Sequence, residues 1–144
     1  MDKFMKAAIA EARKGLKLGG IPIGAVLVKN GKIIGRGFNQ RVEQKDPVKH
    51  AEIDCLEKAG RIGSYKGTVL YSTLMPCYLC AGAIIQFGIK KVFVGESKTF
   101  KGAKRLMLAH GVKVIDLDLD ECREMMREFI KKNPSLWKED IGKL

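Results

Sequence analysis

Apolar residues recur at helical spacing near both ends of the chain and form short, dense runs between them. The spacing of the two terminal stripes predicts amphipathic helices that each bury one face. The N-terminal stripe consists of Phe4, Ala8, Ile9, Ala12 and Leu16. The C-terminal stripe consists of Leu119, Cys122, Met125, Met126, Phe129 and Ile130. A short last helix is expected after Asn133, because Pro134 interrupts the preceding pattern.

The dense apolar runs predict five strands. They cover residues 23–28, 32–38, 68–72, 91–94 and 112–115. Asn30 and Gly31 separate the first two runs and are a strong signal for a hairpin turn. A helix predicted over 76–87 separates the third and fourth runs, and such a strand-helix-strand unit is parallel. Together these units predict an α/β fold with a mixed five-stranded sheet.

Length and composition predict a single domain over residues 1–144, since 46% hydrophobic content suffices for one core. We find no N-terminal apolar segment with a cleavage site and no run of about eighteen apolar residues, so a cytoplasmic protein without membrane contact is expected. Cys55 and Cys122 lie on predicted helix faces. They are expected to be buried thiols, not disulfide partners.

The net charge of +11 and the isoelectric point near 9.6 raise the question of nucleic-acid binding. The positive residues are mostly lysines spread along the whole chain, with pairs of lysines only at 90–91 and 131–132. Aromatic residues are not interleaved with arginine as they are in a single-strand binding groove. This distribution favours a solvated surface, because net charge informs on solubility and association more than on chemistry.

Two short motifs carry the chemistry: His50-Ala51-Glu52, and Pro76-Cys77-Tyr78-Leu79-Cys80. They supply three zinc ligands, His50, Cys77 and Cys80, and one further carboxylate, Glu52. A catalytic zinc site has three protein ligands and an open fourth position, whereas a structural site closes with four. A His-x-Glu sequence followed by Pro-Cys-x-x-Cys is also the signature of the zinc-dependent nucleobase deaminases.

Both motifs are expected at helix N-termini. Asp46 and Pro47 have the character of an N-cap and a first-turn proline, which predicts a helix over 47–58 with His50 and Glu52 near its opening turn. Pro76 is expected to open the second helix in the same way. Free backbone N–H groups at such an end lower thiol pKa values and favour the thiolates that zinc requires.

Two other interpretations of the cysteines are open. A Cys-x-x-Cys pair that stands alone is often a redox pair. A structural zinc site would need a fourth ligand from Cys55, Cys122 or His110, and none of these has finger or ribbon spacing with the other ligands. The nearby His-x-Glu motif favours the catalytic interpretation over both.

Beyond the motifs, the chain resembles the fungal-type cytosine deaminases of the cytidine/deoxycytidylate deaminase superfamily over nearly its full length. The segments that carry the resemblance, besides the two motifs, are 20–24 (GIPIG), 35–39 (GRGFN), 81–85 (AGAII), 94–96 (VGE) with Phe100, and 134–142 (PSLWKEDIG). The resemblance implies a three-layer α/β/α cytidine-deaminase-like fold, one zinc ion per chain, a homodimer, and conversion of free cytosine to uracil in pyrimidine salvage.

The resemblance also implies roles for individual residues. Glu52 matches the proton shuttle, while Asn39 and the backbone N–H of Ala51 match groups that bind the pyrimidine edge. Asp140 matches the carboxylate near the exocyclic amine. Apolar pocket walls match Ile23, Phe100 and Trp137. No organic cofactor is expected.

Two positions depart from the fungal pattern. Ala51 replaces a glycine, and residues 46–53 look more like the corresponding stretch of the tRNA adenosine deaminases. Met75, which is expected in the pocket, replaces a serine. Nucleic-acid editing of the tRNA type, or deamination of another free base such as isocytosine or guanine, is therefore the alternative to cytosine. The tail with Trp137 and Asp140 favours a closed pocket for a small nucleobase, so nucleic acid is not the expected partner.

Overall fold

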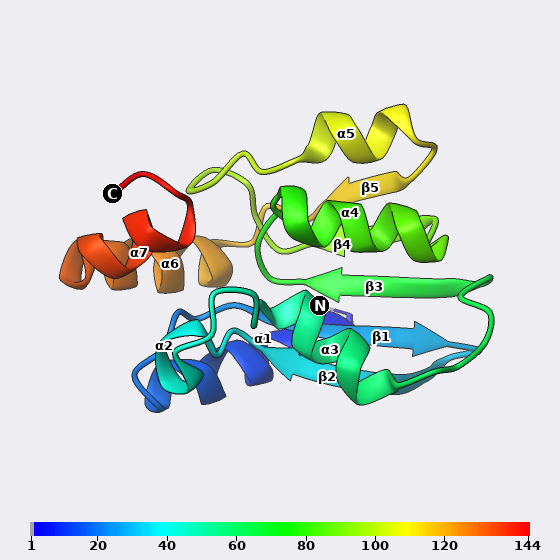
Figure 1. Cartoon of the computed structure of the whole chain (residues 1–144), viewed down its shortest axis with the longest axis horizontal. Coiled ribbons are helices and arrows are strands. Elements are labelled where there is room, and N and C mark those ends of the chain that lie inside the picture. Colours follow the sequence, from blue (N-terminus) through cyan, green and yellow to red (C-terminus); the bar gives the residue numbers. More distant parts are fainter. Residues whose placement is uncertain (1) are drawn as a thin grey trace.

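The computed structural model describes residues 2–144, which form alternating helices and strands (Figure 1). The strands are β1 (Gly24–Lys29), β2 (Lys32–Phe38), β3 (Thr68–Ser72), β4 (Lys91–Val94) and β5 (Lys113–Asp116). The helices are α1 (Lys3–Lys17), α2 (Arg41–Gln44), α3 (Ala51–Ala59), α4 (Tyr78–Phe87), α5 (Lys104–Ala109), α6 (Asp120–Lys132) and α7 (Pro134–Asp140).

The strands form one mixed sheet in the order β2-β1-β3-β4-β5. β1 pairs antiparallel with β2 and β3, whereas β4 is parallel to both β3 and β5. Asn30 and Gly31, between β1 and β2, have φ angles of 53° and 74°. Positive φ at both central residues is what a two-residue hairpin turn requires. The expected mixed five-stranded sheet and the hairpin are therefore confirmed.

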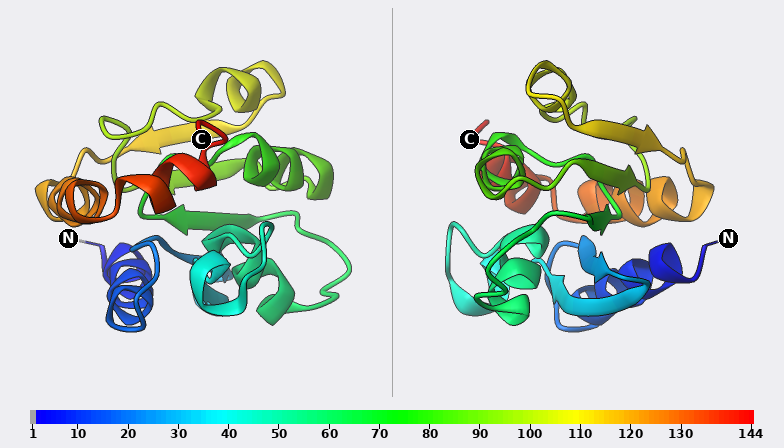
Figure 2. Two further views of the ribbon diagram at one scale, coloured as in Figure 1. Left: turned by 60° about the vertical axis from the view of Figure 1, so that its left-hand side comes forward. Right: turned by 90° about the vertical axis from the view of Figure 1, so that its right-hand side faces the viewer.

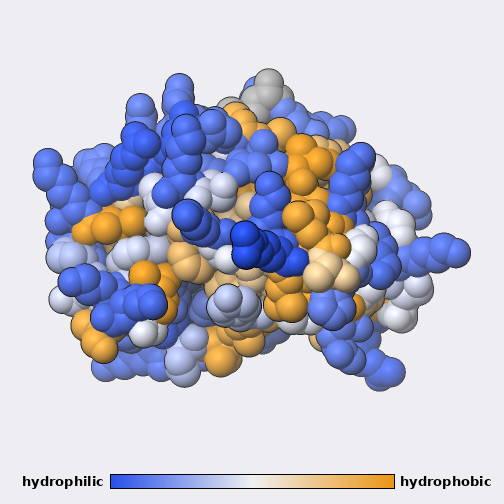
Figure 3. All heavy atoms as spheres, turned by 90° about the horizontal axis from the view of Figure 1, so that it is seen from above, coloured by the Kyte–Doolittle hydropathy of each residue, from blue (hydrophilic) through white to orange (hydrophobic). Residues whose placement is uncertain are grey.

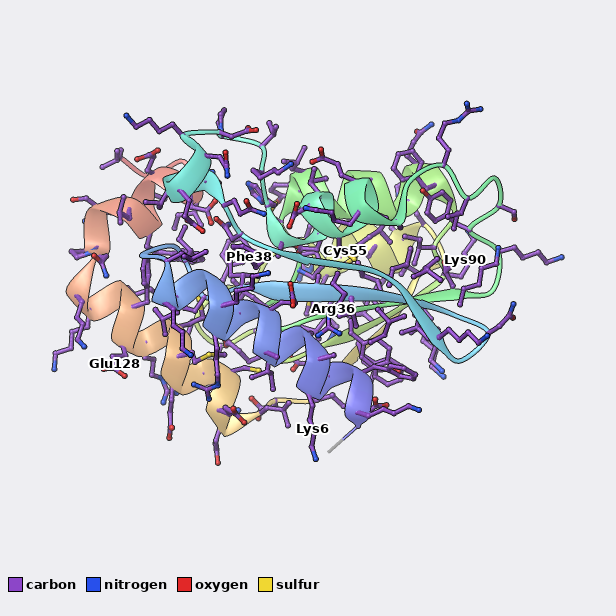
Figure 4. All side chains as sticks on the ribbon, turned by 90° about the horizontal axis from the view of Figure 1, so that it is seen from below. Lys6, Arg36, Phe38, Cys55, Lys90 and Glu128 are labelled. Carbon is purple, nitrogen blue, oxygen red and sulfur yellow. The ribbon has the colours of Figure 1, made fainter. Side chains whose placement is uncertain are left out.

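Helices cover both faces of the sheet and make three layers (Figure 2). One face packs against α1 and α6 around buried residues that include Met5, Val26 and Met125. The other face packs against α3, α4 and α5, and Cys55 of α3 is completely buried there (Figure 4). This arrangement confirms the three-layer α/β/α fold. Of the helices formed by residues 2–144, none combines the length and apolar character that crossing a bilayer requires.

The start of the third helix differs from the predicted one. α3 begins at Ala51, with His50 as its N-cap, and not at Pro47. The Asp46 side chain accepts a hydrogen bond from the Val48 backbone N–H at 2.9 Å, so the Asp-Pro pair forms a local turn before the helix. Similarly, α4 begins at Tyr78 with Cys77 as its N-cap, two residues after Pro76.

The apolar stripe of α1 is also shifted from the predicted one. Met5 and Gly15 are buried, whereas Leu16 is exposed. A Cβ atom on Gly15 would lie 2.9 Å from the ring of Phe38, so the last turn of α1 approaches β2 through its glycine and Leu16 faces solvent. The sequence also did not predict α2 and α5, which have only four and six residues and are too short to show a period.

The packing of α3 on β2 depends on a glycine. A Cβ atom on Gly37 would lie 2.3 Å from the Cys55 backbone nitrogen and 2.6 Å from the Ala51 carbonyl oxygen. Both neighbours are backbone atoms of α3, so they move only if the helix moves. The helix that carries Glu52 therefore lies directly against the backbone of the strand.

Replacing Gly37 with valine should lower the free energy of unfolding by about 1–3 kcal/mol or more, because overpacking forces backbone shifts. The matched control is Arg36→Val, which introduces the same side chain at the exposed neighbouring position of β2 (Figure 4). The control should change stability by less than about 1 kcal/mol. Urea unfolding of both variants measures the difference. Equal stability of Gly37→Val and Arg36→Val would contradict the close packing of α3.

Candidate active site

The N-termini of α3 and α4 meet at one end of the sheet and bring three candidate metal ligands together. His50 is the N-cap of α3, Cys77 is the N-cap of α4, and Cys80 lies in the first turn of α4. His50 Nδ1 lies 3.4 Å from Cys77 Sγ and 3.7 Å from Cys80 Sγ. All three ligand atoms lie within 4.8 Å of one another.

These distances suit a common metal centre. Tetrahedral zinc with ordinary Zn–N and Zn–S bond lengths places the imidazole nitrogen about 3.6 Å from each sulfur. One imidazole and two thiols are also the ligand types that zinc favours, while carboxylate and carbonyl oxygens suit magnesium or calcium. Three such ligands fit a site with an open fourth position.

The pKa values of the three candidate ligands are strongly shifted from their usual values. The hydrogen bond from the Cys80 thiol lowers the pKa of Cys77 to about 4, with the contact to His50 acting in the same direction. The same Cys77–Cys80 hydrogen bond raises the pKa of Cys80 well above its usual value. Burial lowers the pKa of His50, but the contact with Cys77 and the charge of Glu52 outweigh it, so the net shift is upward. Cys77 is therefore the more acidic of the two thiols.

Glu52 lies in the first turn of α3 and is not one of the three gathered ligands. Its side chain is buried. Burial, together with the negative charge of Cys77, raises the pKa of Glu52 to about 7. A carboxyl group with a pKa near neutrality can both accept and donate a proton at physiological pH, as general acid-base catalysis requires.

A small pocket lies next to these groups. Its volume is about 20 Å³, which is about the room that one water molecule needs. The residues that line it are Ile23, Asn39, His50, Glu52, Leu74, Met75, Cys77, Phe100, Trp137, Asp140 and Ile141. Phe100 and Trp137 meet edge to face, with ring centroids 5.6 Å apart. The pocket is therefore closed by α7 and by the loop that carries Phe100.

The structure brings together nearly all the residues that the sequence singled out. Cys80 and Ala51 are completely buried and contribute no surface to the pocket. Ala51 is the first residue of α3, where backbone N–H groups have no partner within the helix. Two apolar lining residues, Leu74 and Ile141, were not singled out from the sequence. Leu74 is adjacent to Met75 and Ile141 is adjacent to Asp140, and both of these neighbours were singled out.

Asn39 contributes an unpaired donor to the pocket. Its backbone N–H continues the strand by donating to the Ile23 carbonyl at 3.0 Å. Its side-chain oxygen accepts a hydrogen bond from the Arg41 backbone N–H at 3.1 Å. The Nδ2 group is buried and has no hydrogen-bond partner among residues 2–144. Because a buried unpaired donor is costly, this group is suited to bind a ligand.

Asp140 contributes an acceptor from the opposite side. Its Oδ1 atom is buried and has no hydrogen-bond partner within the described part of the chain. The same oxygen forms ion pairs with Arg41 Nε at 3.3 Å and with His50 Nε2 at 3.5 Å. Burial raises the pKa of Asp140, although the positive charges of His50 and Arg41 oppose this effect. A carboxylate behind a metal-binding histidine often orients the ring.

Sequence reasoning missed the contact between Asp140 and His50 and the whole contribution of Arg41. Arg41 lies in α2, a helix too short for any periodic signal, and about one hundred residues separate it from Asp140. Only its position two residues after Asn39 pointed toward the pocket. Burial of a charged residue in the folded chain is what identifies it.

Comparison with known proteins connects this geometry to a family. The family model described as "Cytidine and deoxycytidylate deaminase zinc-binding region" matches residues 1–96. The chain is 39% identical over 143 residues to a cytosine deaminase of Candida albicans, and the match covers 97% of this chain and 95% of that protein. The matched family region ends before Phe100, whereas the full-length match includes the tail.

A second group of relatives has a different activity. The chain is 36% identical over 142 residues to the tRNA-specific adenosine deaminase of Aquifex aeolicus, covering 91% of this chain and 94% of that protein. A solved structure from a study of A-to-I editing by tRNA:A34 deaminases superposes with a TM-score of 0.75 at 33% identity. That match covers 85% of this chain and 97% of the other.

Proposed function

The chain belongs to the cytidine and deoxycytidylate deaminase family, and from this premise we propose that it is a zinc-dependent cytosine deaminase, which hydrolyses free cytosine to uracil and ammonia. The observation that carries the choice of substrate is a pair of buried polar atoms in the pocket lining that have no hydrogen-bond partner among residues 2–144, the donor Asn39 Nδ2 and the acceptor Asp140 Oδ1. Cytosine offers a ring carbonyl to the first and an exocyclic amine to the second. Similarity to the Candida albicans cytosine deaminase also supports this substrate.

His50, Cys77 and Cys80 would hold the zinc ion, since their donor atoms surround one point at suitable distances. When bound, zinc supplies Lewis acidity that lowers the pKa of a water molecule to about 7 and so provides a nucleophile at neutral pH. Proton transfer is carried out by a residue of the chain that does not bind the metal.

Glu52 moves the protons in this scheme. Its carboxylate accepts a proton from the attacking water and passes it to ring nitrogen N3 while the C4–O bond forms. Glu52 then takes the remaining proton of the hydroxyl added at C4 and passes it to the amine nitrogen, so the C4–N bond breaks, ammonia leaves and C4 keeps a carbonyl oxygen. The overall reaction consumes one water per cytosine. A pKa of about 7 suits a group that must both take and give a proton.

Positioning of the base falls to the other pocket residues. Asn39 Nδ2 and the Ala51 backbone N–H donate to the ring carbonyl, and Asp140 accepts from the amine. Apolar side chains of Ile23, Phe100 and Trp137 hold the ring and exclude water. Fixing the ring beside the nucleophile makes the attack effectively intramolecular, a contribution that can be large.

Editing of tRNA is the second candidate. Similarity to the Aquifex aeolicus tRNA deaminase over most of the chain and the net charge of +11 favour it. Closure of the pocket by α7 favours a free base, because an editor must admit a nucleotide that is still attached to its strand. On the face that carries α5, both hydrophilic and apolar residues reach the surface (Figure 3).

The test of the proposal is ammonia release, together with the change in ultraviolet absorbance, when the zinc-loaded protein is given cytosine, cytidine, isocytosine or guanine. We expect turnover of cytosine and none of cytidine, since α7 and Phe100 lie over the pocket and a ribose would have to displace them further than the base alone. If isocytosine or guanine is turned over faster than cytosine, the deamination chemistry stands and that base replaces cytosine as the proposed substrate. Equal turnover of cytosine and cytidine would contradict a pocket closed around the base.

Replacing Cys77 with serine should abolish stoichiometric zinc, because the site would lose one of three protein ligands. Atomic absorption on the purified protein is expected to give about one zinc per chain for the native sequence and close to none for Cys77→Ser. Cys122→Ala is the matched control, since Cys122 is a buried thiol on α6 outside the ligand group. Full zinc content in Cys77→Ser, or loss in Cys122→Ala, would contradict the assigned ligands.

We also propose that the protein is a homodimer. α4 exposes three large apolar side chains, those of Tyr78, Leu79 and Phe87, and Tyr78 alone is 76% exposed. Several such side chains on one helix are typical of an interaction surface. Sedimentation equilibrium of the native chain and of Tyr78→Lys would show whether this helix forms the contact.

A further inference from the structure

Arg41 is a buried cation between the closing helix and the segment that leads to His50. Its side chain is only 10% exposed. The Nε group donates a hydrogen bond to the Pro47 carbonyl at 2.9 Å and lies 3.3 Å from Asp140 Oδ1. One side-chain group therefore links α2, the loop before His50 and the end of α7.

The backbone of Arg41 has a separate contact with the pocket. Its N–H donates to Asn39 Oδ1 at 3.1 Å. An amide whose oxygen is engaged in this way presents its nitrogen on the other side, and Asn39 Nδ2 is the buried atom without a partner among residues 2–144. Arg41 thus contacts Asn39 and Asp140, the two residues that supply the donor and the acceptor of the pocket.

The charge of Arg41 has no substitute nearby. Among the described residues, only His50 is also paired with Asp140. An imidazole that binds zinc through Nδ1 is neutral, so it faces Asp140 through Nε2 without supplying a positive charge. Lys45 lines a cavity of about 290 Å³ on the outer side of Arg41 but forms no ion pair with Asp140 within the described chain. Glu139 is exposed and lies 3.9 Å from the guanidinium, too far to hold it.

We propose that Arg41 is a positioning residue for the deaminase reaction: its backbone orients Asn39, and its guanidinium fixes Asp140 on α7 at the pocket. This inference rests on the proposed function for the identity of the substrate. The contacts of Arg41 from which it is argued are independent of the substrate. Arginine suits this place because its Nε–H donates to the Pro47 carbonyl while its delocalised charge lies beside the Asp140 carboxylate. A lysine ammonium keeps the charge but has no group at the Nε position, so it can restore only part of the effect.

The test compares Arg41→Met and Arg41→Lys with Arg123→Met in the zinc-loaded full chain. Arg123 is the matched control because it is 11% exposed and paired with Asp118 and Asp120, on the segment leading into α6. Arg41→Met should lower kcat/KM for cytosine about a hundredfold, since a misplacement of about 1 Å can cost that much. Arg41→Lys should recover a substantial part, and Arg123→Met should keep the native value.

Trp137 gives a readout that needs no substrate, because it is the only tryptophan and lies on α7. Acrylamide quenching of its fluorescence should increase in Arg41→Met, increase less in Arg41→Lys, and stay native in Arg123→Met. If the native protein does not turn over cytosine, the proposed function fails while quenching still tests Arg41. Native quenching in a folded Arg41→Met variant would overturn the proposal.

A double-variant cycle tests whether Arg41 acts through Asp140. In an Asp140→Asn background, Arg41→Met should cause little further loss of kcat/KM, because coupled residues are not additive. Fully additive losses of kcat/KM in the double variant would overturn the proposal. A loss of kcat/KM in Arg123→Met equal to that in Arg41→Met would also overturn it, because it would mean a general effect on stability.

Discussion

Replacing Glu52 with glutamine is expected to lower kcat for cytosine by about a hundredfold to ten-thousandfold, the usual contribution of a placed proton-transfer group. Glutamine has nearly the same shape, so the buried site keeps its packing. It cannot accept a proton from water or return one to the leaving amine. Zinc content should not change, since Glu52 is not among the three gathered ligands.

The control for this loss is Glu57→Gln, which removes a carboxylate from the same helix at an exposed position beside Lys49. Stopped-flow absorbance with cytosine measures both variants, and metal analysis of the same samples shows whether zinc is retained. Native turnover in Glu52→Gln would exclude Glu52 as the proton shuttle. That result, in a zinc-loaded protein, would favour a metal-stabilised binding module without chemistry.

Replacing Asp140 with asparagine should lower kcat/KM for cytosine by at least about a hundredfold, a loss larger than its effect on folding explains. The carboxylate is 6% exposed and its Oδ1 has no hydrogen-bond partner in residues 2–144. Buried polar groups that must pair with a substrate discriminate strongly, often by several powers of ten. Stability should also fall, because removing one partner of a largely buried ion pair leaves the Arg41 guanidinium without its carboxylate.

The neighbouring Glu139→Gln is the control for Asp140→Asn, since its side chain is 57% exposed and does not line the pocket. Steady-state kinetics and urea unfolding of both variants separate turnover from folding. Native cytosine kinetics in Asp140→Asn would contradict the assignment of Asp140 to the amine. A large drop in stability with unchanged kinetics would make Asp140 a purely structural partner of Arg41.

Strands were predicted well because dense apolar runs between turn residues leave few alternatives. The run over 68–72 corresponds to β3 and the run over 91–94 to β4, with the same bounds. Helix starts were predicted less well. Asp46 and Pro47 satisfy the rules for a cap, yet the same residues also suit a turn, and only the packing of α3 on Gly37 shows where the helix begins.

The site was predictable to the extent that it depends on local spacing. His50, Glu52, Cys77 and Cys80 each lie at or near a helix start, so two short motifs were enough to find them. Trp137 and Asp140 were placed by resemblance, because no period or spacing connects the C-terminal segment to the zinc motifs. Arg41 was missed, since its importance comes from contacts with residues that are distant in sequence.

We propose that this chain deaminates a free base and not a base within a polynucleotide. To test this, one zinc-loaded preparation is given either cytosine or a tRNA anticodon stem-loop, with Glu52→Gln as the blank, and ammonia release is followed. We expect release from cytosine and none from the stem-loop, because α7 closes the pocket. Release from the stem-loop alone would contradict it and would show that α7 moves to admit a nucleotide still joined to its strand.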